Sequence, residues 1–133
     1  MQPDEPVYSA FKSKSGLSRI AGAMRYSLQG LASAWKHEHA FRQELWVIVP
    51  ATIAALLLPV SAIEKLLLVG SMVLVLVVEL LNSAIEAVVD RISLERHPLS
   101  GNAKDFGSAA VMLTVLLSAA TWAVVLWGLF RPG

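Results

Sequence analysis

The feature that most constrains this chain is a long apolar segment that ends in a stripe of polar residues. The segment begins near Leu66 and is almost wholly apolar up to Val78. Beyond that point polar residues recur at helical spacing, and only Leu, Ile, Val or Ala separate them. At about 100° per residue, this spacing places them within one narrow arc of a helix. The members of this polar stripe are Glu79, Asn82, Ser83, Glu86 and Asp90.

A helix with this pattern is apolar almost all round, which a soluble amphipathic helix is not. A charge inside a bilayer costs several kcal/mol unless it is paired or hydrated, so carboxylates there usually mark a functional site. Two other interpretations of the polar stripe stay open. It could hold helices together as a polar seam, or it could lie just outside the membrane.

The composition excludes several classes of protein. The chain has 133 residues, enough for one domain, and 56% of them are hydrophobic, which is too apolar for an ordinary soluble domain. It has no cysteine, so it has neither a disulfide nor a cysteine metal site. A net charge of +1 and the lack of a basic-aromatic pattern argue against nucleic-acid binding. The N-terminus has no apolar core of a cleavable signal peptide.

Three segments are long and apolar enough to span a bilayer, at about residues 40–59, 63–90 and 104–130. The second exceeds a core of about 30 Å, so it should tilt or project. Of the eleven basic residues, nine lie before or at the start of the first span, or between the second and third spans. Only Lys65 and Arg131 lie on the opposite side of the predicted membrane. The positive-inside rule therefore predicts a cytoplasmic N-terminus and places the polar stripe at the cytoplasmic end of its helix.

An amphipathic helix is predicted before the first span, at about residues 17–36. Its apolar positions recur at helical spacing and its basic residues lie away from them, which indicates a helix on the cytoplasmic membrane surface. A soluble helix packed on other protein is the alternative. Residues 1–16 are predicted to form a disordered or loosely held tail. The apolar positions are Leu17, Ile20, Met24, Leu28, Leu31 and Trp35.

Glu38 stands between His37 and His39, just before the first span. Alternate residues on a helix point in different directions, so His37 and His39 do not by themselves predict a metal site. Glu38 could instead meet Glu86 around a hard cation such as Mg²⁺, which prefers one or two carboxylates together with phosphate and water. A solvated charge at the membrane surface is the alternative.

The segment after Asp90 contains His97-Pro98 and Ser100-Gly101, which predict a helix break. Ser100 or Asn102 could then cap the third span. Lys104 could contact phosphate or extend to the membrane surface, and Asp105 could orient Lys104 or fix a helix end. No GxxxxGK[ST], GxGxxG, HRD or DFG motif is present, so no soluble nucleotide-binding fold is indicated.

The run VELLNSAIEAVVDR, followed by HPLSGNAKDFGSAA, resembles the bacterial integral-membrane diacylglycerol kinase family, and so do HAFRQE and the upstream AWKHE. The resemblance extends from about Leu17 to the C-terminus. It implies an all-α membrane protein of the bacterial cytoplasmic (inner) membrane, with a surface helix and three spans. It also implies a homotrimer that phosphorylates a membrane lipid alcohol from MgATP, at sites between protomers near the cytoplasmic surface.

The resemblance also implies the roles of individual residues. Glu79 is the expected general base, Glu38 and Glu86 are the expected metal ligands, and Asn82 and Asp105 complete the catalytic set. The expected ATP-binding positions are Arg19, Tyr26, Glu38, Glu86, Glu95, Arg96, His97, Lys104 and Asp105. The expected lipid-binding positions are Arg19, Ala23, Met24, Arg25, Tyr26, Ser27, Leu28, Ala32, Ser33, Ala34, Trp35, Ala40, Phe41, Arg42, Gln43, Glu44, Glu79 and Ser108.

Two departures from the family pattern lie away from the expected chemical centre. Leu28 replaces an aromatic residue of some members, which could alter lipid fit, and Arg96 replaces a Tyr, which could alter nucleotide contact. The nearest alternative function is the same reaction on undecaprenol, since both substrates present a primary alcohol at the membrane surface. A second class is a small membrane transporter or assembly subunit, although no inverted repeat is visible.

Overall fold

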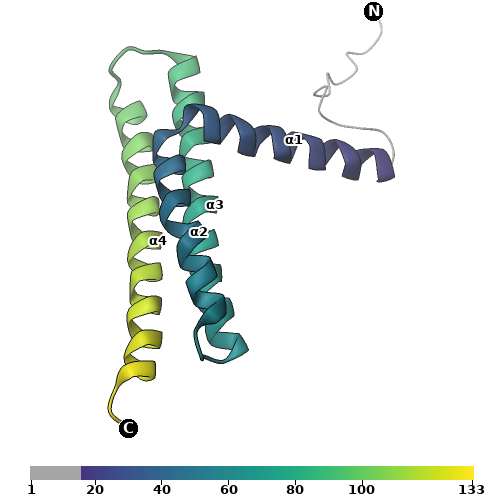
Figure 1. Ribbon diagram of the computed structural model, residues 1–133. Helices are drawn as coiled ribbons and strands as arrows, with labels where there is room; N and C mark the ends of the chain where they lie inside the picture. Colours follow the sequence, from purple (N-terminus) through teal and green to yellow (C-terminus); the bar gives the residue numbers. More distant parts are fainter. Residues whose placement is uncertain (1–15) are drawn as a thin grey trace, which may run out of the picture. The chain divides into compact units, whose positions relative to one another are not determined.

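A computed structural model describes residues 16–133, and within this range the only regular secondary structure is α-helix (Figure 1). The helices are α1 (Gly16–His37), α2 (His39–Leu57), α3 (Ala62–Ile92) and α4 (Pro98–Phe130). Helices α2, α3 and α4 are each long and apolar enough to cross a membrane. The prediction of an all-α membrane protein with three spans is therefore confirmed. Except for Gly16, the predicted tail lies outside the described residues.

The described chain divides into two compact units, and the boundary in the sequence lies between His37 and Glu38. The first unit contains α1. The apolar positions of α1, from Leu17 to Trp35, are exposed to the surroundings. Its last turn carries Lys36 and His37, and positive charge there complements the partial negative charge of the helix C-terminus.

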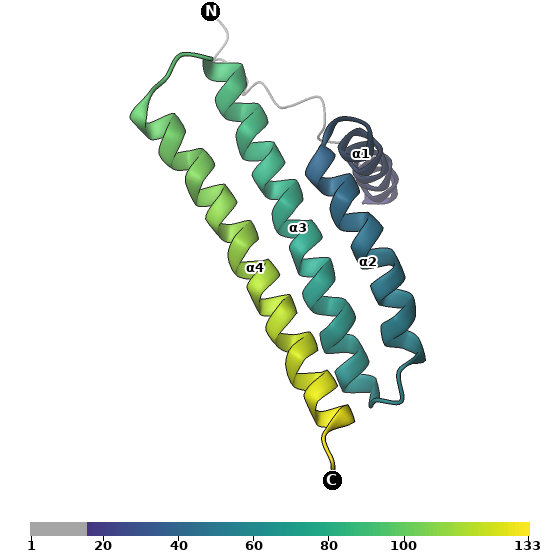
Figure 2. The same cartoon turned by 60° about the vertical axis from the view of Figure 1, so that its left-hand side comes forward.

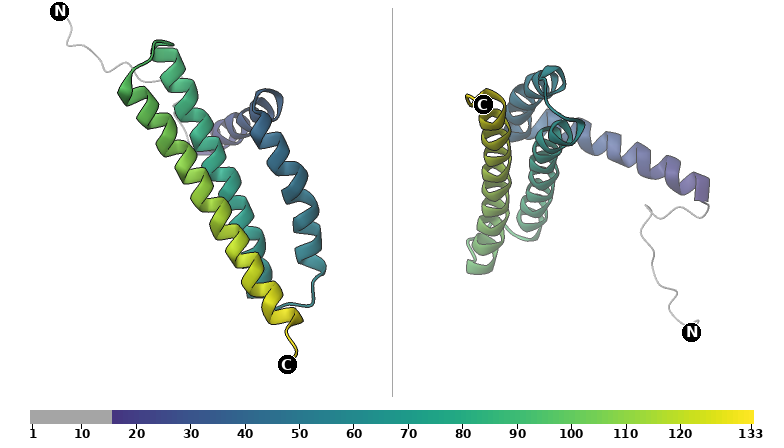
Figure 3. Two further views of the ribbon diagram at one scale, coloured as in Figure 1. Left: turned by 90° about the vertical axis from the view of Figure 1, so that its left-hand side faces the viewer. Right: turned by 90° about the horizontal axis from the view of Figure 1, so that it is seen from below.

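The second unit contains α2, α3 and α4 as antiparallel neighbours, with α3 between the other two (Figure 2). Helix α4 runs beside α3 along most of its length, and α3 packs against α2 less extensively (Figure 3). Near the α2–α3 connection, the buried side chains Ala55, Leu68 and Val125 form a small core. Further along the α3–α4 pair, the Ser71 and Ser118 hydroxyls form a hydrogen bond of 3.0 Å. Most other apolar side chains point outward, as in a helix bundle that faces lipid.

The α2–α3 connection is short and held by local polar contacts. Ser61 caps α3 by accepting a 3.1 Å hydrogen bond from the Glu64 backbone N–H, and the Glu64 carboxylate accepts one of 3.1 Å from the Ser61 N–H. Lys65 Nζ donates to the Leu56 carbonyl at 2.8 Å, which satisfies an open carbonyl at the end of α2. These contacts fix the turn at the end of the bundle opposite the polar stripe.

Helix α4 begins earlier than the expected start of its span at about residue 104. His97 is its N-cap, and His97 Nδ1 accepts a 3.1 Å hydrogen bond from the Leu99 N–H. Pro98 occupies the first helical position, where its fixed φ and missing N–H suit a helix. The prediction that Ser100 or Asn102 caps this helix was therefore wrong, because both residues lie within α4. Pro98 starts the helix instead of interrupting it.

Candidate functional site

The polar stripe of α3 passes from a buried end to an exposed end. Glu79 is 6% exposed and Asn82 is 8% exposed, while Glu86 is half-buried and Asp90 is exposed. Met72 precedes Glu79 on the same inward face of α3. The helical spacing in the sequence placed these polar residues on one face, and the packing of α3 turns the first part of that face inward. Carboxylates on one helix therefore experience very different degrees of contact with water.

Asn82 links the buried part of the stripe to Glu86. Its Nδ2 donates a 3.4 Å hydrogen bond to Glu86 Oε1, one turn further along α3. Its Oδ1 is buried and has no hydrogen-bond partner within residues 16–133. A contact of this kind restricts the orientation of a carboxylate that could bind a metal ion.

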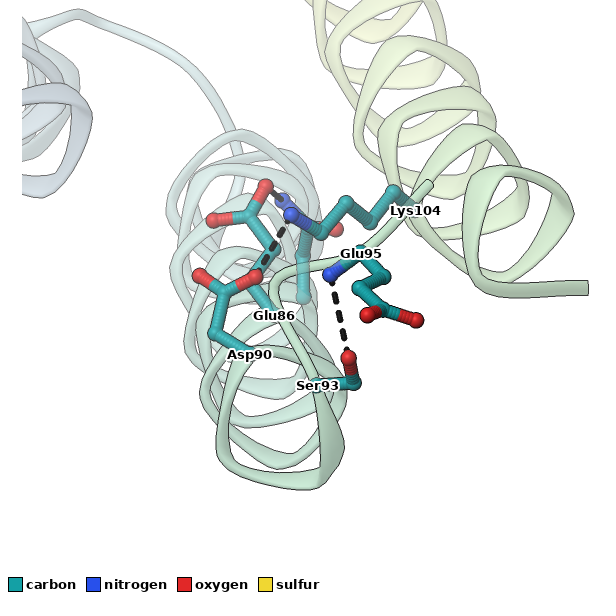
Figure 4. Close-up of polar contacts among 6 residues, drawn as sticks. Glu86, Asp90, Ser93, Glu95 and Lys104 are labelled. Carbon is teal, nitrogen blue, oxygen red and sulfur yellow. Dashed lines mark hydrogen bonds and ion pairs between the residues drawn. The ribbon is translucent and has the colours of Figure 1, made fainter. Parts of the chain in front are cut away.

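Lys104 brings positive charge from α4 to the exposed end of the stripe. Its Nζ lies 2.7 Å from Asp90 Oδ1, and both side chains are close to half-exposed, at 43% and 49% (Figure 4). It is also close enough to Glu86 for electrostatic attraction. Asp90 of α3 therefore orients the Lys104 ammonium group in this structure, in the role that the sequence analysis considered for Asp105. Asp105 is exposed on α4 and follows Lys104 by one residue, so it points about 100° away from it.

The connection between α3 and α4 forms a polar pocket beside this ion pair. Ser93 Oγ accepts a 3.0 Å hydrogen bond from the Glu95 N–H, which holds the connection in a tight bend (Figure 4). The pocket has a volume of about 470 Å³. Asp90 is one of the residues that line it. The lining also includes four of the predicted ATP-binding residues, which are Glu95, Arg96, His97 and Lys104.

Helix α2 brings a second carboxyl group to Glu79. The Glu44 and Glu79 side chains lie close enough to interact electrostatically, and Glu44 Oε2 is buried without a hydrogen-bond partner among the described residues. The sequence analysis assigned Glu44 to lipid binding and did not connect it with Glu79. No periodicity could have connected them, because they lie on different helices.

An apolar cavity of about 480 Å³ opens beside Glu44 between α2, α3 and α4. Apolar and small side chains form most of its walls, and Gln43 lies at its edge near Glu44. Of the other predicted lipid-binding positions on α2, Phe41 is buried, Arg42 is half-buried and Ala40 is exposed. The cavity residues beyond Gln43 and Glu44 are Val47, Ile48, Ala51, Met72, Val75, Val115, Ser118, Ala119 and Trp122.

Glu38 lies at the N-cap of α2 and makes no side-chain capping hydrogen bond. Both Glu38 and Glu86 act electrostatically on Glu79, so all three carboxylates lie in the same region. No group of three or more His, Asp or Glu side chains in residues 16–133 has the arrangement of a metal site. Glu38 and Glu86 are ligands of the type that Mg²⁺ takes, since that ion binds one or two protein carboxylates and completes its shell with phosphate and water.

The remaining predicted site residues lie on α1 or apart from the stripe. Ser108 is exposed on α4. On α1, Ala34 is the buried residue and the other predicted positions are exposed. The Ser27 hydroxyl donates to the Ala23 carbonyl at 2.8 Å, within the helix. These exposed positions on α1 are Arg19, Ala23, Met24, Arg25, Tyr26, Ser27, Leu28, Ala32, Ser33 and Trp35.

Comparison with known proteins gives a consistent result. A family model described as "Prokaryotic diacylglycerol kinase" matches residues 25–126. A diacylglycerol kinase of Escherichia coli strain K12 is 51% identical over 116 residues, which cover 87% of this chain and 95% of that protein. Another, of Pseudomonas aeruginosa, is 52% identical over 120 residues, or 90% and 98% of the two chains. A third, of Haemophilus influenzae, is 45% identical over 116 residues.

Proposed function

The chain belongs to the prokaryotic diacylglycerol kinase family, and from this we propose that it phosphorylates diacylglycerol to phosphatidic acid. It is a lipid kinase embedded in a membrane. The phosphate donor in this proposal is ATP, and Mg²⁺ accompanies it. We also propose that the protein lies in the bacterial inner membrane with its N-terminus in the cytoplasm. The distribution of basic residues supports this orientation.

One observation carries the proposed reaction: carboxylates and an ammonium group meet at one end of helices that are otherwise apolar. Glu44 of α2 lies near Glu79 of α3. Asn82 and Glu86 follow Glu79 along α3, and Lys104 of α4 contacts Asp90 at the end of the same stripe. Phosphoryl transfer from ATP needs neutralised phosphates, an aligned nucleophile and an acceptor for its proton. The two kinds of side chain supply these functions close to the lipid.

In this proposal each residue performs a defined part of the reaction. Glu79 accepts the proton of the lipid hydroxyl as that oxygen bonds to the γ-phosphorus of ATP, while the bond from this phosphorus to the β–γ bridging oxygen breaks and ADP leaves. Lys104 contacts phosphate, and the α3–α4 connection holds the nucleotide in the pocket lined by Glu95 and His97. Glu38 and Glu86 hold Mg²⁺, which when bound neutralises phosphate charge. Asn82 keeps Glu86 oriented through its 3.4 Å hydrogen bond.

The test is transfer of labelled γ-phosphate from ATP to purified lipids in detergent micelles. Diacylglycerol is expected to be labelled, and labelling should depend on both the protein and the lipid. Undecaprenol and a lipid without a hydroxyl group are assayed in parallel. Labelling of undecaprenol alone would assign the enzyme to the other lipid alcohol. ATP turnover that is independent of any lipid alcohol, or no turnover at all, would contradict the proposal.

A Mg²⁺ titration at fixed ATP tests the assigned metal ligands. Glu38→Gln and Glu86→Gln should each raise the Mg²⁺ concentration for half-maximal activity, because each removes one anionic ligand. Neither change removes a helix cap, since the Glu38 side chain makes no capping hydrogen bond. Glu64→Gln is the matched control, because glutamine preserves the capping box at the opposite end of α3. Unchanged half-saturation in both variants would exclude these residues as ligands.

A further inference from the structure

Gly107 of α4 is buried against the side chain of Asn82. A Cβ atom at this position would overlap Asn82 Oδ1 and would lie 3.1 Å from its Cγ. Gly70 and Gly128 differ, because a Cβ at either one would meet no atom within 4 Å. Because Gly107 has only a hydrogen atom in place of a side chain, the amide of Asn82 has room to pack against α4. The sequence analysis did not select this glycine, since nothing in helix periodicity identifies the residue across from it.

The position of the Asn82 amide determines what its other end can contact. The amide is planar, so Oδ1 and Nδ2 move together when the side chain rotates. Nδ2 donates to Glu86 Oε1, while Oδ1 faces Gly107 and has no hydrogen-bond partner in the described range. Displacing Oδ1 from Gly107 must therefore rotate Nδ2 away from Glu86.

A second contact holds α4 in the register that this arrangement requires. Lys104 precedes Gly107 by three residues on α4, and Asp90 follows Glu86 by four residues on α3. Because the two helices are antiparallel, the 2.7 Å Lys104–Asp90 ion pair lies about one turn of α4 and about two turns of α3 from the Gly107–Asn82 contact. The two contacts together fix which face of α4 lies against the stripe.

We propose that Gly107 is a positioning residue for the metal-binding half of the site. Its missing side chain lets Asn82 pack against α4 and hold Glu86 in place for a divalent cation. This inference rests on the proposed function, because that function assigns Glu86 to the metal. Gly107 itself touches neither substrate nor cation and acts only through Asn82.

The test uses Gly107→Ala in the full-length protein, with Mn²⁺ as the probe for the cation and a non-hydrolysable ATP analogue. Mn²⁺ binding measured by electron paramagnetic resonance should weaken by about 10–100-fold, the range typical for lost support of a metal ligand. In the turnover assay, the Mg²⁺ half-saturation point should rise similarly while the KM for lipid changes less than about twofold. Gly128→Ala and Gly70→Ala are the matched controls and should leave both quantities unchanged.

A double-mutant cycle with Asn82→Ala separates this mechanism from a general packing defect. If Gly107 acts through Asn82, Gly107→Ala should weaken Mn²⁺ binding no further in the Asn82→Ala background. It should also raise the Tm of that background, because alanine fills the vacated space and favours a helix more than glycine does. Recovery of folding in the double variant would support the inference even if Gly107→Ala alone misfolds.

Two results would overturn the inference while leaving the proposed function intact. One is Mn²⁺ binding by Gly107→Ala that equals binding by Gly128→Ala. The other is an equal loss of binding from Gly107→Ala with and without Asn82. If the wild-type protein binds no Mn²⁺ in the presence of the nucleotide, the proposed function itself fails and the role assigned to Gly107 fails with it.

Discussion

At the scale of single residues, the central arrangement is the contact between Glu44 and Glu79. Glu79 lies on the face of α3 that its spacing predicted, but the carboxyl group beside it comes from α2. Glu44 also lines the apolar cavity between the helices, which has the character of a site for a lipid chain. In the proposed reaction, the base Glu79 therefore has a neighbour that only the fold supplies.

Glu79→Gln should lower kcat by about 10²–10⁴-fold, the contribution typical of a general base. Nucleotide affinity should remain close to that of the wild type, because the ion pair and the polar pocket lie further along α3 and α4. Steady-state kinetics and equilibrium binding of an ATP analogue measure the two quantities. Retention of most of the wild-type kcat would show that another group accepts the proton.

Glu44→Ala should reduce kcat more than Glu44→Gln does. Glutamine keeps a polar side chain of the same size that can donate a hydrogen bond to the nearby Glu79, whereas alanine removes the polar neighbour of a buried carboxylate. A lost hydrogen bond to a charged group corresponds to roughly tenfold or more in rate, at about 1.4 kcal/mol per factor of ten. The comparison is made at saturating lipid. Equal activity of both variants would show that Glu44 contributes only to lipid contact.

At the scale of helices, the sequence was sufficient wherever one helix determined the outcome. The apolar runs predicted α2, α3 and α4, and the spacing from Glu79 to Asp90 predicted their common face. The start of α4 was misjudged because Pro98 can either break a helix or begin one, and only the His97 cap decides between these. Contacts between helices depend on register and rotation, which periodicity does not contain. The Lys104–Asp90 and Gly107–Asn82 contacts were therefore beyond prediction.

The exposed apolar positions of α1 lead to a prediction about the lipid. Met24 lies among them, and a helix of this kind rests with its apolar side in the membrane surface. Met24→Asp should therefore raise the KM for diacylglycerol by more than the KM for ATP. Met24→Leu preserves the apolar surface and serves as the control. Equal increases in both constants would indicate general misfolding.

At the scale of the whole molecule, the exposed residues of α3 and α4 lead to the prediction that a neighbouring chain completes the site. Ala84 and Ala87 are small and exposed on α3, which permits close approach of another helix. Asp105 is exposed and points away from Lys104, which contacts the stripe of its own chain. A closed cyclic assembly would give every chain the same cover. The homotrimer that the family resemblance implies would meet these requirements, and it stays a prediction.

Subunit mixing tests whether sites are shared between chains. Glu79→Gln and Asp105→Asn proteins, each inactive alone, are unfolded, combined and reassembled. Activity should return, because some mixed oligomers then contain one site with both native residues. Reassembly of each variant with itself is the control and should remain inactive. An inactive mixture in which crosslinking demonstrates mixed oligomers would mean that each site is built within one chain.

The gradual change in exposure along α3 has a consequence for how the two substrates meet. One is an oil-soluble alcohol and the other a highly charged, water-soluble nucleotide, and neither dissolves where the other is abundant. The side chains of Glu79 and Asn82 are at most 8% exposed, whereas the side chain of Asp90, two to three turns later on α3, is about half-exposed. In the proposed reaction, the single helix α3 thus crosses the boundary between the lipid phase and the aqueous phase. Each reactant can stay in its own solvent, and the oxygen and phosphorus atoms that must bond are brought together at that boundary.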